Sequence, residues 1–93
     1  MYTIGMRYEW DEKKRLTNIG KHGLDFLDVS VVFDSLHVVV PSVQSSEERF
    51  LSIGTLDGRF VTVVYTIRDK NIRIISFRRA RNEERDIYQK LQF

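Results

Sequence analysis

Seven basic residues gather in one short stretch of the chain, and six of them are arginines. In order, they are Arg68, Lys70, Arg73, Arg78, Arg79, Arg81 and Arg85. A planar guanidinium can bind a phosphate through two parallel hydrogen bonds, which a lysine ammonium cannot do. A clustered basic face is typical of proteins that bind nucleic acid. The alternative is a solvated surface on which these charges form scattered ion pairs.

The two histidines differ in their sequence surroundings, and only His22 is a candidate for acid–base chemistry. An imidazole has an ordinary pKa near neutrality, so it can accept or donate a proton at physiological pH. Lys21 precedes His22, and its charge favours the neutral imidazole. The alternative is a structural histidine that caps a helix or bonds a carbonyl. His37 lies in an apolar stretch without a basic neighbour, which favours a structural role.

Composition excludes several kinds of site. The chain has no cysteine, which excludes a disulfide framework, a thiolate nucleophile and a thiolate metal site. Two distant histidines and no paired aspartates offer no ligand spacing, so we expect neither a metal ion nor a cofactor. The five glycines lack the spacing of a phosphate-binding loop.

Length and hydropathy bound the organisation of the chain. Its 93 residues are sufficient for one domain, which we expect to span residues 1–93. The hydrophobic share of 42% is enough to bury a core. No apolar run approaches the ~18 residues of a membrane span. We therefore expect a soluble, cytoplasmic protein without a membrane partner.

The elements that position the candidate residues follow from the pattern. Residues 6–10 alternate as a short strand does, and Asp11 is a suitable N-cap. A polar helix is expected from there to about Ile19, with Gly20 as its C-cap. A second helix is expected over residues 24–33 and a strand over 36–40, which Pro41 stops.

A pair of hairpins is the clearest signal. Asp57-Gly58, between the apolar stretches 50–56 and 59–67, is the signature of a two-residue hairpin turn. A second turn at Asp69-Lys70 leads into a strand over 71–77. In that strand, period two predicts Arg73, Ile75 and Phe77 on one side, with Ile72, Ile74 and Ser76 on the other.

A last helix is expected to start near Asn82 as its N-cap, with Ile87, Tyr88 and Leu91 facing inward. The sequence therefore predicts an α+β fold. Its small antiparallel sheet consists of a three-strand meander plus short strands. Two N-terminal helices and one C-terminal helix pack on one face of this sheet.

Three blocks of residues, at these spacings, carry a resemblance to a known family. They are Trp10-Asp11, Lys14, Asn18, Lys21-His22-Gly23 and Phe26; then Glu48-Arg49 and Ile53-Gly54; then Ile72 to Ser76, Arg78, Ala80, Glu84-Arg85 and Tyr88, with Arg68 between the last two blocks. Together they resemble the BrnT-type toxins of bacterial type II toxin–antitoxin pairs, which are similar in fold to RelE and ParE toxins. Phe77 and Val29 depart from the family, which usually has alanine at both positions.

The resemblance implies a toxin that cleaves RNA and blocks translation. It also implies a cognate antitoxin encoded in the same operon, in a 2:2 heterotetramer with the toxin. The antitoxin would carry the DNA-binding part, so that the complex represses its own operon and the toxin meets DNA only through its partner.

Metal-independent RNA cleavage needs a base for the 2′-hydroxyl, an acid for the 5′ oxygen and cations for the charged phosphorane. RNA supplies its own nucleophile, and the product is a 2′,3′-cyclic phosphate. His22 is the first candidate for base or acid. Glu48 is the alternative base, unless it only forms a surface ion pair. Arg68 and Arg78 are the candidates for the scissile phosphate, since both match the family.

Other residues are candidates for contacts with the rest of the RNA: Lys13, Lys14, Lys21, Arg79, Arg81 and Trp10. The lysines can equally form a solvated helix face. Trp10 and Tyr88 could stack on a base, although aromatic side chains at such positions more often belong to a core.

Two other functions stay open. A ParE-like toxin with this fold would inhibit DNA gyrase by binding, without catalysis, because fold does not fix function. A plain RNA-binding module would bind RNA with strong salt dependence and leave it intact. A titratable group among cations favours catalysis over both.

Overall fold

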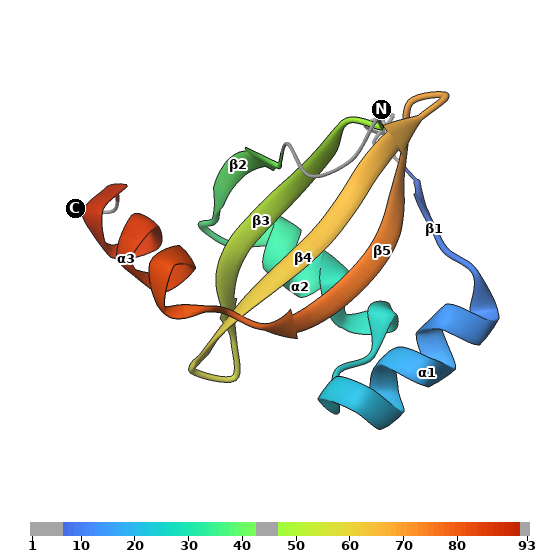
Figure 1. The fold of residues 1–93 in the computed structure, drawn as a ribbon, viewed down its shortest axis with the longest axis horizontal. Helices are drawn as coiled ribbons and strands as arrows, with labels where there is room; N and C mark the ends of the chain where they lie inside the picture. The colour runs from blue at the N-terminus through green and yellow to red at the C-terminus, as the bar shows by residue number, and fades with distance from the viewer. Residues whose placement is uncertain (1–6, 43–46, 92–93) are drawn as a thin grey trace, which may run out of the picture.

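The computed structural model describes residues 7–42 and 47–91 (Figure 1). Its elements are β1 (Tyr8–Glu9), α1 (Glu12–His22), the 3-10 helix η1 (Phe26–Asp28), α2 (Val29–Asp34), β2 (Val38–Ser42), β3 (Arg49–Leu56), β4 (Arg59–Arg68), β5 (Asn71–Arg79) and α3 (Asn82–Leu91). The expected α+β class is confirmed. No helix of the described part is long and apolar enough to cross a membrane.

The five strands form one sheet in the order β1-β5-β4-β3-β2. Strands β2 to β5 pair antiparallel in succession, so the meander has four strands rather than the expected three. The short β1 pairs parallel to β5 and makes the sheet mixed. Both predicted hairpin turns are present, and their four central residues, Asp57, Gly58, Asp69 and Lys70, have φ between 50° and 77°.

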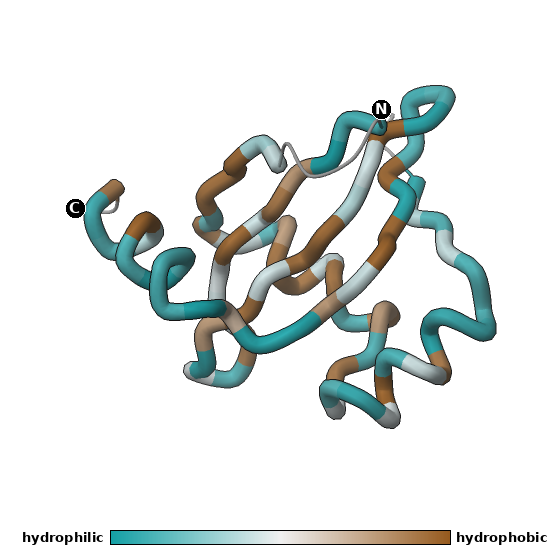
Figure 2. The backbone as a smooth tube through the Cα atoms, viewed as in Figure 1, coloured by the Kyte–Doolittle hydropathy of each residue, from teal (hydrophilic) through white to brown (hydrophobic). Residues whose placement is uncertain are grey.

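The helices cover both faces of the sheet, and the prediction of one covered face is wrong (Figure 1). Helix α2 and η1 pack on the face that carries Val61, Val63 and Phe77, and bury Phe26, Val29 and Val32 there. Helix α3 lies on the opposite face, where Glu84 bonds Thr62 and the Tyr88 ring meets Phe60 edge-on. Successive residues of β4 therefore face different helices. In Figure 2 the strands and α2 carry most of the hydrophobic colour, whereas α1 and α3 are largely hydrophilic.

A register shift between β4 and β5 changes which residues of β5 face the core. Tyr65 pairs with Ile74 but Val64 pairs with Ser76, so Ile75 is an extra residue in β5. Such a bulge breaks the alternation of side chains. Phe77 consequently lies in the core with Ile72 and Ile74, not with Arg73 as period two predicts.

Helix α1 begins as expected but ends later. The Asp11 carboxylate accepts hydrogen bonds from the backbone N–H groups of Lys13 and Lys14, which confirms the N-cap. The predicted C-cap at Gly20 is wrong, because the helix continues to His22 and ends at Gly23, where φ is 69°. Only a glycine adopts this conformation without steric cost. His22 thus belongs to the last helical turn.

The remaining boundaries differ by short distances from the prediction. The second helix is split into η1 and α2 and ends at Asp34. Strand β2 runs through Pro41, which is tolerated because β2 is an edge strand. At α3 the Glu84 carboxylate accepts the backbone N–H of Arg81 at 2.8 Å, so the N-cap is Arg81 rather than Asn82. Leu91 is 58% exposed and does not face inward.

One buried side chain fastens α1 to the free edge of β5. The Asn18 amide donates to the carbonyl oxygens of Leu24 and Phe77, and its oxygen accepts the Phe77 N–H. Asn18 therefore bonds both backbone groups of Phe77, at a point of the edge that β1 does not reach. This contact fixes the end of α1, and with it His22, beside β5.

Candidate functional site

His22 lines two hollows that meet at the end of α1. The first lies between α1 and β5 and has a volume of about 260 Å³. Four basic or titratable side chains of α1 line it together, namely Lys13, Lys14, Lys21 and His22. Ser76 and Ile75 of β5 form the opposite wall. The structure thus brings together three predicted RNA-binding lysines and the predicted acid–base residue.

The second hollow lies between the end of α1 and the β3–β4 turn. Its volume is about 460 Å³, and its walls combine apolar side chains with two arginines. Leu24, Leu56 and Val61 form the apolar part, and Arg59 and Arg79 the basic part. His22 therefore has a lysine-rich hollow on one side and an arginine-lined hollow on the other.

The surroundings of His22 keep its imidazole neutral. Partial burial lowers its pKa from the ordinary 6.5, and the positive charges of Lys21 and Arg78 lower it further. A histidine with a lowered pKa is deprotonated at pH 7 and can accept a proton. The contribution of Arg78 also shows that its guanidinium lies within electrostatic range of His22.

A third hollow adjoins the first across β5, since Ser76 and Ile75 line both. It has a volume of about 250 Å³ and lies on the sheet face that carries α3. Three arginines line it: Arg49 from β3, Arg78 from β5 and Arg81 before α3. The predicted phosphate ligand Arg78 and the predicted RNA-binding residue Arg81 therefore line the same hollow.

A buried ion pair orients Arg78 in this third hollow. The Nη1 and Nη2 atoms of Arg78 donate to the two carboxylate oxygens of Glu84, both at 2.8 Å. The Glu84 oxygen Oε1 also accepts from Thr62 and from the Arg81 N–H. Burial raises the pKa of Glu84, but these bonds outweigh it and lower the pKa from 4.5 to about 2. Glu84 is therefore ionised and balances the charge of Arg78.

Arg49 carries a buried donor without a partner. Its Nε atom makes no hydrogen bond within the described residues, although the solvent does not reach it. A buried unpaired donor costs about 1–3 kcal/mol, which an acceptor such as a phosphate oxygen can offset. The third hollow thus has the donors for an anion but, apart from Glu84, no carboxylate among its described lining residues.

The chain is similar to known proteins in sequence and in fold. The family model of the ribonuclease toxin BrnT, of type II toxin–antitoxin systems, matches residues 10–84. The chain belongs to the BrnT family. The crystal structure of the Brucella abortus ribonuclease toxin BrnT superposes with a TM-score of 0.69 and 36% identity. The alignment covers 83% of this chain and 99% of that one, whereas no curated protein matches. A type II toxin implies a cognate antitoxin as partner.

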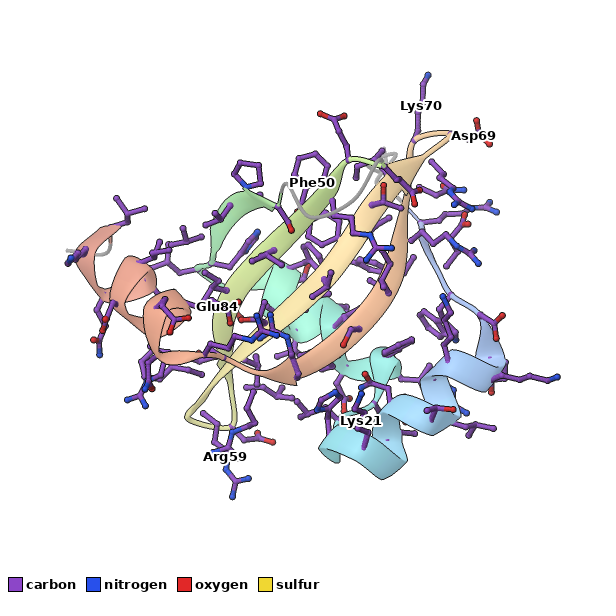
Figure 3. All side chains as sticks on the ribbon, in the orientation of Figure 1. Lys21, Phe50, Arg59, Asp69, Lys70 and Glu84 are labelled. Carbon is purple, nitrogen blue, oxygen red and sulfur yellow. The ribbon has the colours of Figure 1, made fainter. Side chains whose placement is uncertain are left out.

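The BrnT fold separates two predicted catalytic residues from His22 and Arg78. Arg68 pairs with Asn71 at the far end of β4, whereas Arg78 pairs with Thr62. Six residues of a strand span about 20 Å. Figure 3 shows the same separation, with Lys21 and Arg59 at one end of the sheet and Asp69 and Lys70 at the other. Arg68 forms an ion pair with Glu47, and the backbone oxygen of Glu48 accepts from Thr66 at that same end.

Two other predicted residues of this BrnT-family chain lie away from the hollows. Trp10 packs against Phe26 edge-on, and its indole N–H donates to Glu12. The Nδ1 atom of His37 lies 2.8 Å from the Ser35 carbonyl oxygen, which agrees with the structural role expected for it. Tyr88 is buried, as expected for a core aromatic.

Sequence analysis missed Arg49 and Arg59 as site residues. Arg49 stands in the second family block, and a charged residue at the start of an apolar strand was a usable signal. Arg59 directly follows the Asp57-Gly58 turn and lies outside the basic stretch. Its proximity to His22 depends on the packing of α1 against the sheet, which no local pattern indicates.

Proposed function

We propose that this BrnT-family chain is an endoribonuclease that cleaves RNA in the cytoplasm without a metal ion, and that His22 is its general base. The observation that carries the proposal is the position of His22 between two basic hollows, where burial and neighbouring positive charges lower its pKa. The family, named for ribonuclease toxins, supports RNA as the substrate.

The cleavage step uses the nucleophile that RNA itself provides. The His22 imidazole takes the proton of a 2′-hydroxyl while the 2′ oxygen attacks the adjacent phosphorus. The bond from phosphorus to the 5′ oxygen breaks, and this oxygen is protonated from solvent. The products are a 2′,3′-cyclic phosphate and a free 5′-hydroxyl. Fixed cations stabilise the negative charge that develops on the phosphorane.

The arginines of the third hollow are the cations for this step. Arg78 is oriented by Glu84, and Arg49 lines the hollow from β3 with a guanidinium whose Nε has no partner among the described residues. Arg81 lines the same hollow. The lysines of α1, namely Lys13, Lys14 and Lys21, bind phosphates on the other side of His22. Arg68 has no part in this step, since it lies at the far end of the sheet in an ion pair with Glu47.

Within residues 7–42 and 47–91, no three histidine, aspartate or glutamate side chains are grouped as metal ligands. The step above draws all of its charge stabilisation from protein cations.

The partner implied by the family would silence this activity. We propose a DNA-binding antitoxin from the same operon, which forms a 2:2 heterotetramer with the toxin and represses that operon. The free toxin would block translation by cutting RNA. A fold similar to RelE and ParE toxins fits this role.

The experiment is cleavage of a single-stranded RNA by the purified, antitoxin-free chain in EDTA. The proposal predicts cleavage with 2′,3′-cyclic phosphate ends, and no cleavage where the nucleotide carries a 2′-deoxy sugar. Cleavage at 2′-deoxy positions, or only after addition of a divalent metal, would contradict the mechanism. Intact RNA, both free and on translating ribosomes, together with inhibited gyrase supercoiling, would instead favour the ParE-like alternative.

A further inference from the structure

The arginine-lined hollow beside His22 has the shape and chemistry of a nucleotide-binding site. Its volume of about 460 Å³ lies within the ~300–1,000 Å³ range of ligand pockets. One wall is apolar and formed by Leu24, Leu56 and Val61, so a base can lie against it. Arg59 and Arg79 are the cross-strand neighbours of Leu56 and Val61, and their guanidinium groups, which suit a phosphate, line the same hollow.

These two arginines are free to bind a ligand. Both are exposed, and neither guanidinium forms an ion pair or hydrogen bond with the described residues. This distinguishes them from Arg78, whose charge Glu84 balances. Asp57 lines the hollow as well, but two arginines still leave a net positive charge there.

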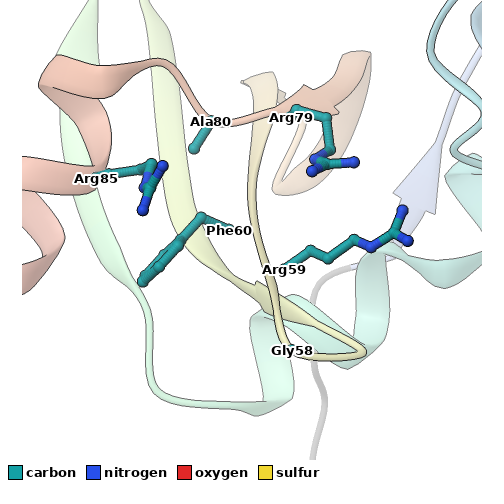
Figure 4. A pocket seen from close by; sticks show the side chains of 6 residues that line it. All are labelled: Gly58, Arg59, Phe60, Arg79, Ala80 and Arg85. Atoms are coloured by element: carbon teal, nitrogen blue, oxygen red, sulfur yellow. The ribbon is translucent and has the colours of Figure 1, made fainter.

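The basic surface continues around the end of the sheet. Arg59 and Arg79 also line an adjoining hollow of about 440 Å³ with Gly58, Phe60, Ala80 and Arg85. No carboxylate belongs to this lining among the described residues. Figure 4 shows Arg59 and Arg79 on one side of the strand end and Arg85 beside Phe60 on the other. The Arg85 guanidinium lies 5.0 Å above the Phe60 ring, which holds it in place.

We propose that the hollow formed by His22, Leu24, Leu56, Arg59 and Arg79 is a subsite for one RNA nucleotide next to the cleaved bond. The inference rests on the proposed ribonuclease function and specifies how its substrate extends. The base lies against the apolar wall, its phosphate binds Arg59 and Arg79, and the next phosphate of a longer strand reaches Arg85. His22 lines both this subsite and the lysine-rich hollow, so one RNA strand that occupies both hollows passes the general base.

The test measures binding separately from cleavage. A labelled dodecamer and a dinucleotide, both 2′-O-methylated and therefore not cleavable, are titrated with the wild type by fluorescence polarisation at several salt concentrations. The variant is Arg59→Gln/Arg79→Gln. Its matched control is Arg7→Gln/Lys70→Gln, which removes two exposed positive charges at the other end of the sheet, where the Ile72 N–H bonds the Arg7 carbonyl oxygen. A dodecamer of glutamate serves as a second polyanion.

The subsite predicts that the arginine variant loses affinity for the dodecamer by about tenfold or more, while the control keeps it. The magnitude of the slope of log affinity against log salt should fall by about 0.7, since both arginines bind one phosphate and each phosphate contact to single strands contributes ~0.7. For cleavable RNA, KM should rise with little change in kcat. Equal dodecamer affinity in variant and control would overturn the subsite. An equal loss for the glutamate peptide would assign the arginines to any polyanion, and would overturn it as well. Because the probe cannot be cleaved, these results stand even where the wild type proves inactive on RNA.

Discussion

Arg78 acts on two titratable residues of the site. It lowers the pKa of Glu84 through a bidentate contact, and it adds to the lowering of the pKa of His22 that burial and Lys21 mainly cause. Since Glu84 balances the charge of Arg78, the additional positive charge for a phosphate comes from Arg49, Arg81 and the α1 lysines. The arginines of the third hollow therefore differ in role: Glu84 orients Arg78, whereas Arg49 and Arg81 supply additional positive charge.

Glu84→Gln should destabilise the protein by about 2–3 kcal/mol at pH 7, because it leaves Arg78 without its buried partner. The pKa of Glu84 is lowered from 4.5 to about 2, so its stabilisation is complete above pH 4.5 and is lost as the pH falls towards 2. Urea unfolding between pH 2 and 7 measures this, with the exposed Glu83→Gln as control. A difference in the free energy of unfolding between wild type and Glu84→Gln that is as large at pH 2 as at pH 7 would argue against the ion pair.

Arg78→Gln should raise the pKa of His22 towards 6.5. The variant removes a positive charge near the imidazole and leaves the Glu84 carboxylate unbalanced, and both changes favour the protonated ring. An NMR titration of the histidine ring signals measures this shift. Lys70→Gln, at the far end of the sheet, should leave the His22 titration unchanged. An unchanged His22 pKa in Arg78→Gln would place the arginine too far away to act on it.

At the scale of elements, local signals predicted the hairpins well and the helix end poorly. Asp57-Gly58 specifies a tight turn whatever the rest of the chain does, and both hairpins were predicted in place. Two glycines three residues apart, Gly20 and Gly23, stand near the end of α1, and periodicity does not tell which one ends the helix. The Asn18 contact with β5 holds the end of the helix against the sheet, and that contact joins residues 59 positions apart.

The two glycines of α1 give a matched pair of variants. Gly20 lies in the helix and Gly23 has φ 69°, and an added Cβ meets no atom within 4 Å at either position. Gly20→Ala should therefore stabilise the protein by about 0.5–1 kcal/mol through helix propensity. Gly23→Ala should destabilise it by about 1–2 kcal/mol through the left-handed backbone. Chemical denaturation of both variants measures the difference, and the opposite order would show that the helix ends at Gly20.

At the scale of the whole molecule, the sequence predicted the fold class and the family but not which residues meet. His22, the α1 lysines, Arg78 and Arg81 converge around β5, whereas Arg68 and Glu48 lie at the other end of the sheet. The residues that match the family give an order along the chain, but they do not indicate how far apart these residues lie in the fold. The register shift at Ile75 and the position of α3 on the opposite face of the sheet determine which side chains meet. Both depend on packing between segments that are distant in the sequence.

The pH dependence of RNA cleavage in EDTA tests the central claim most directly. If His22 is the general base, the single-turnover rate of the wild type rises with pH and levels off above a pKa below 6.5. His22→Ala should lose about 100-fold or more in rate and lose the rising limb, while His37→Ala keeps both. A His22→Ala protein that cleaves at the wild-type rate with the same pH profile would contradict the account.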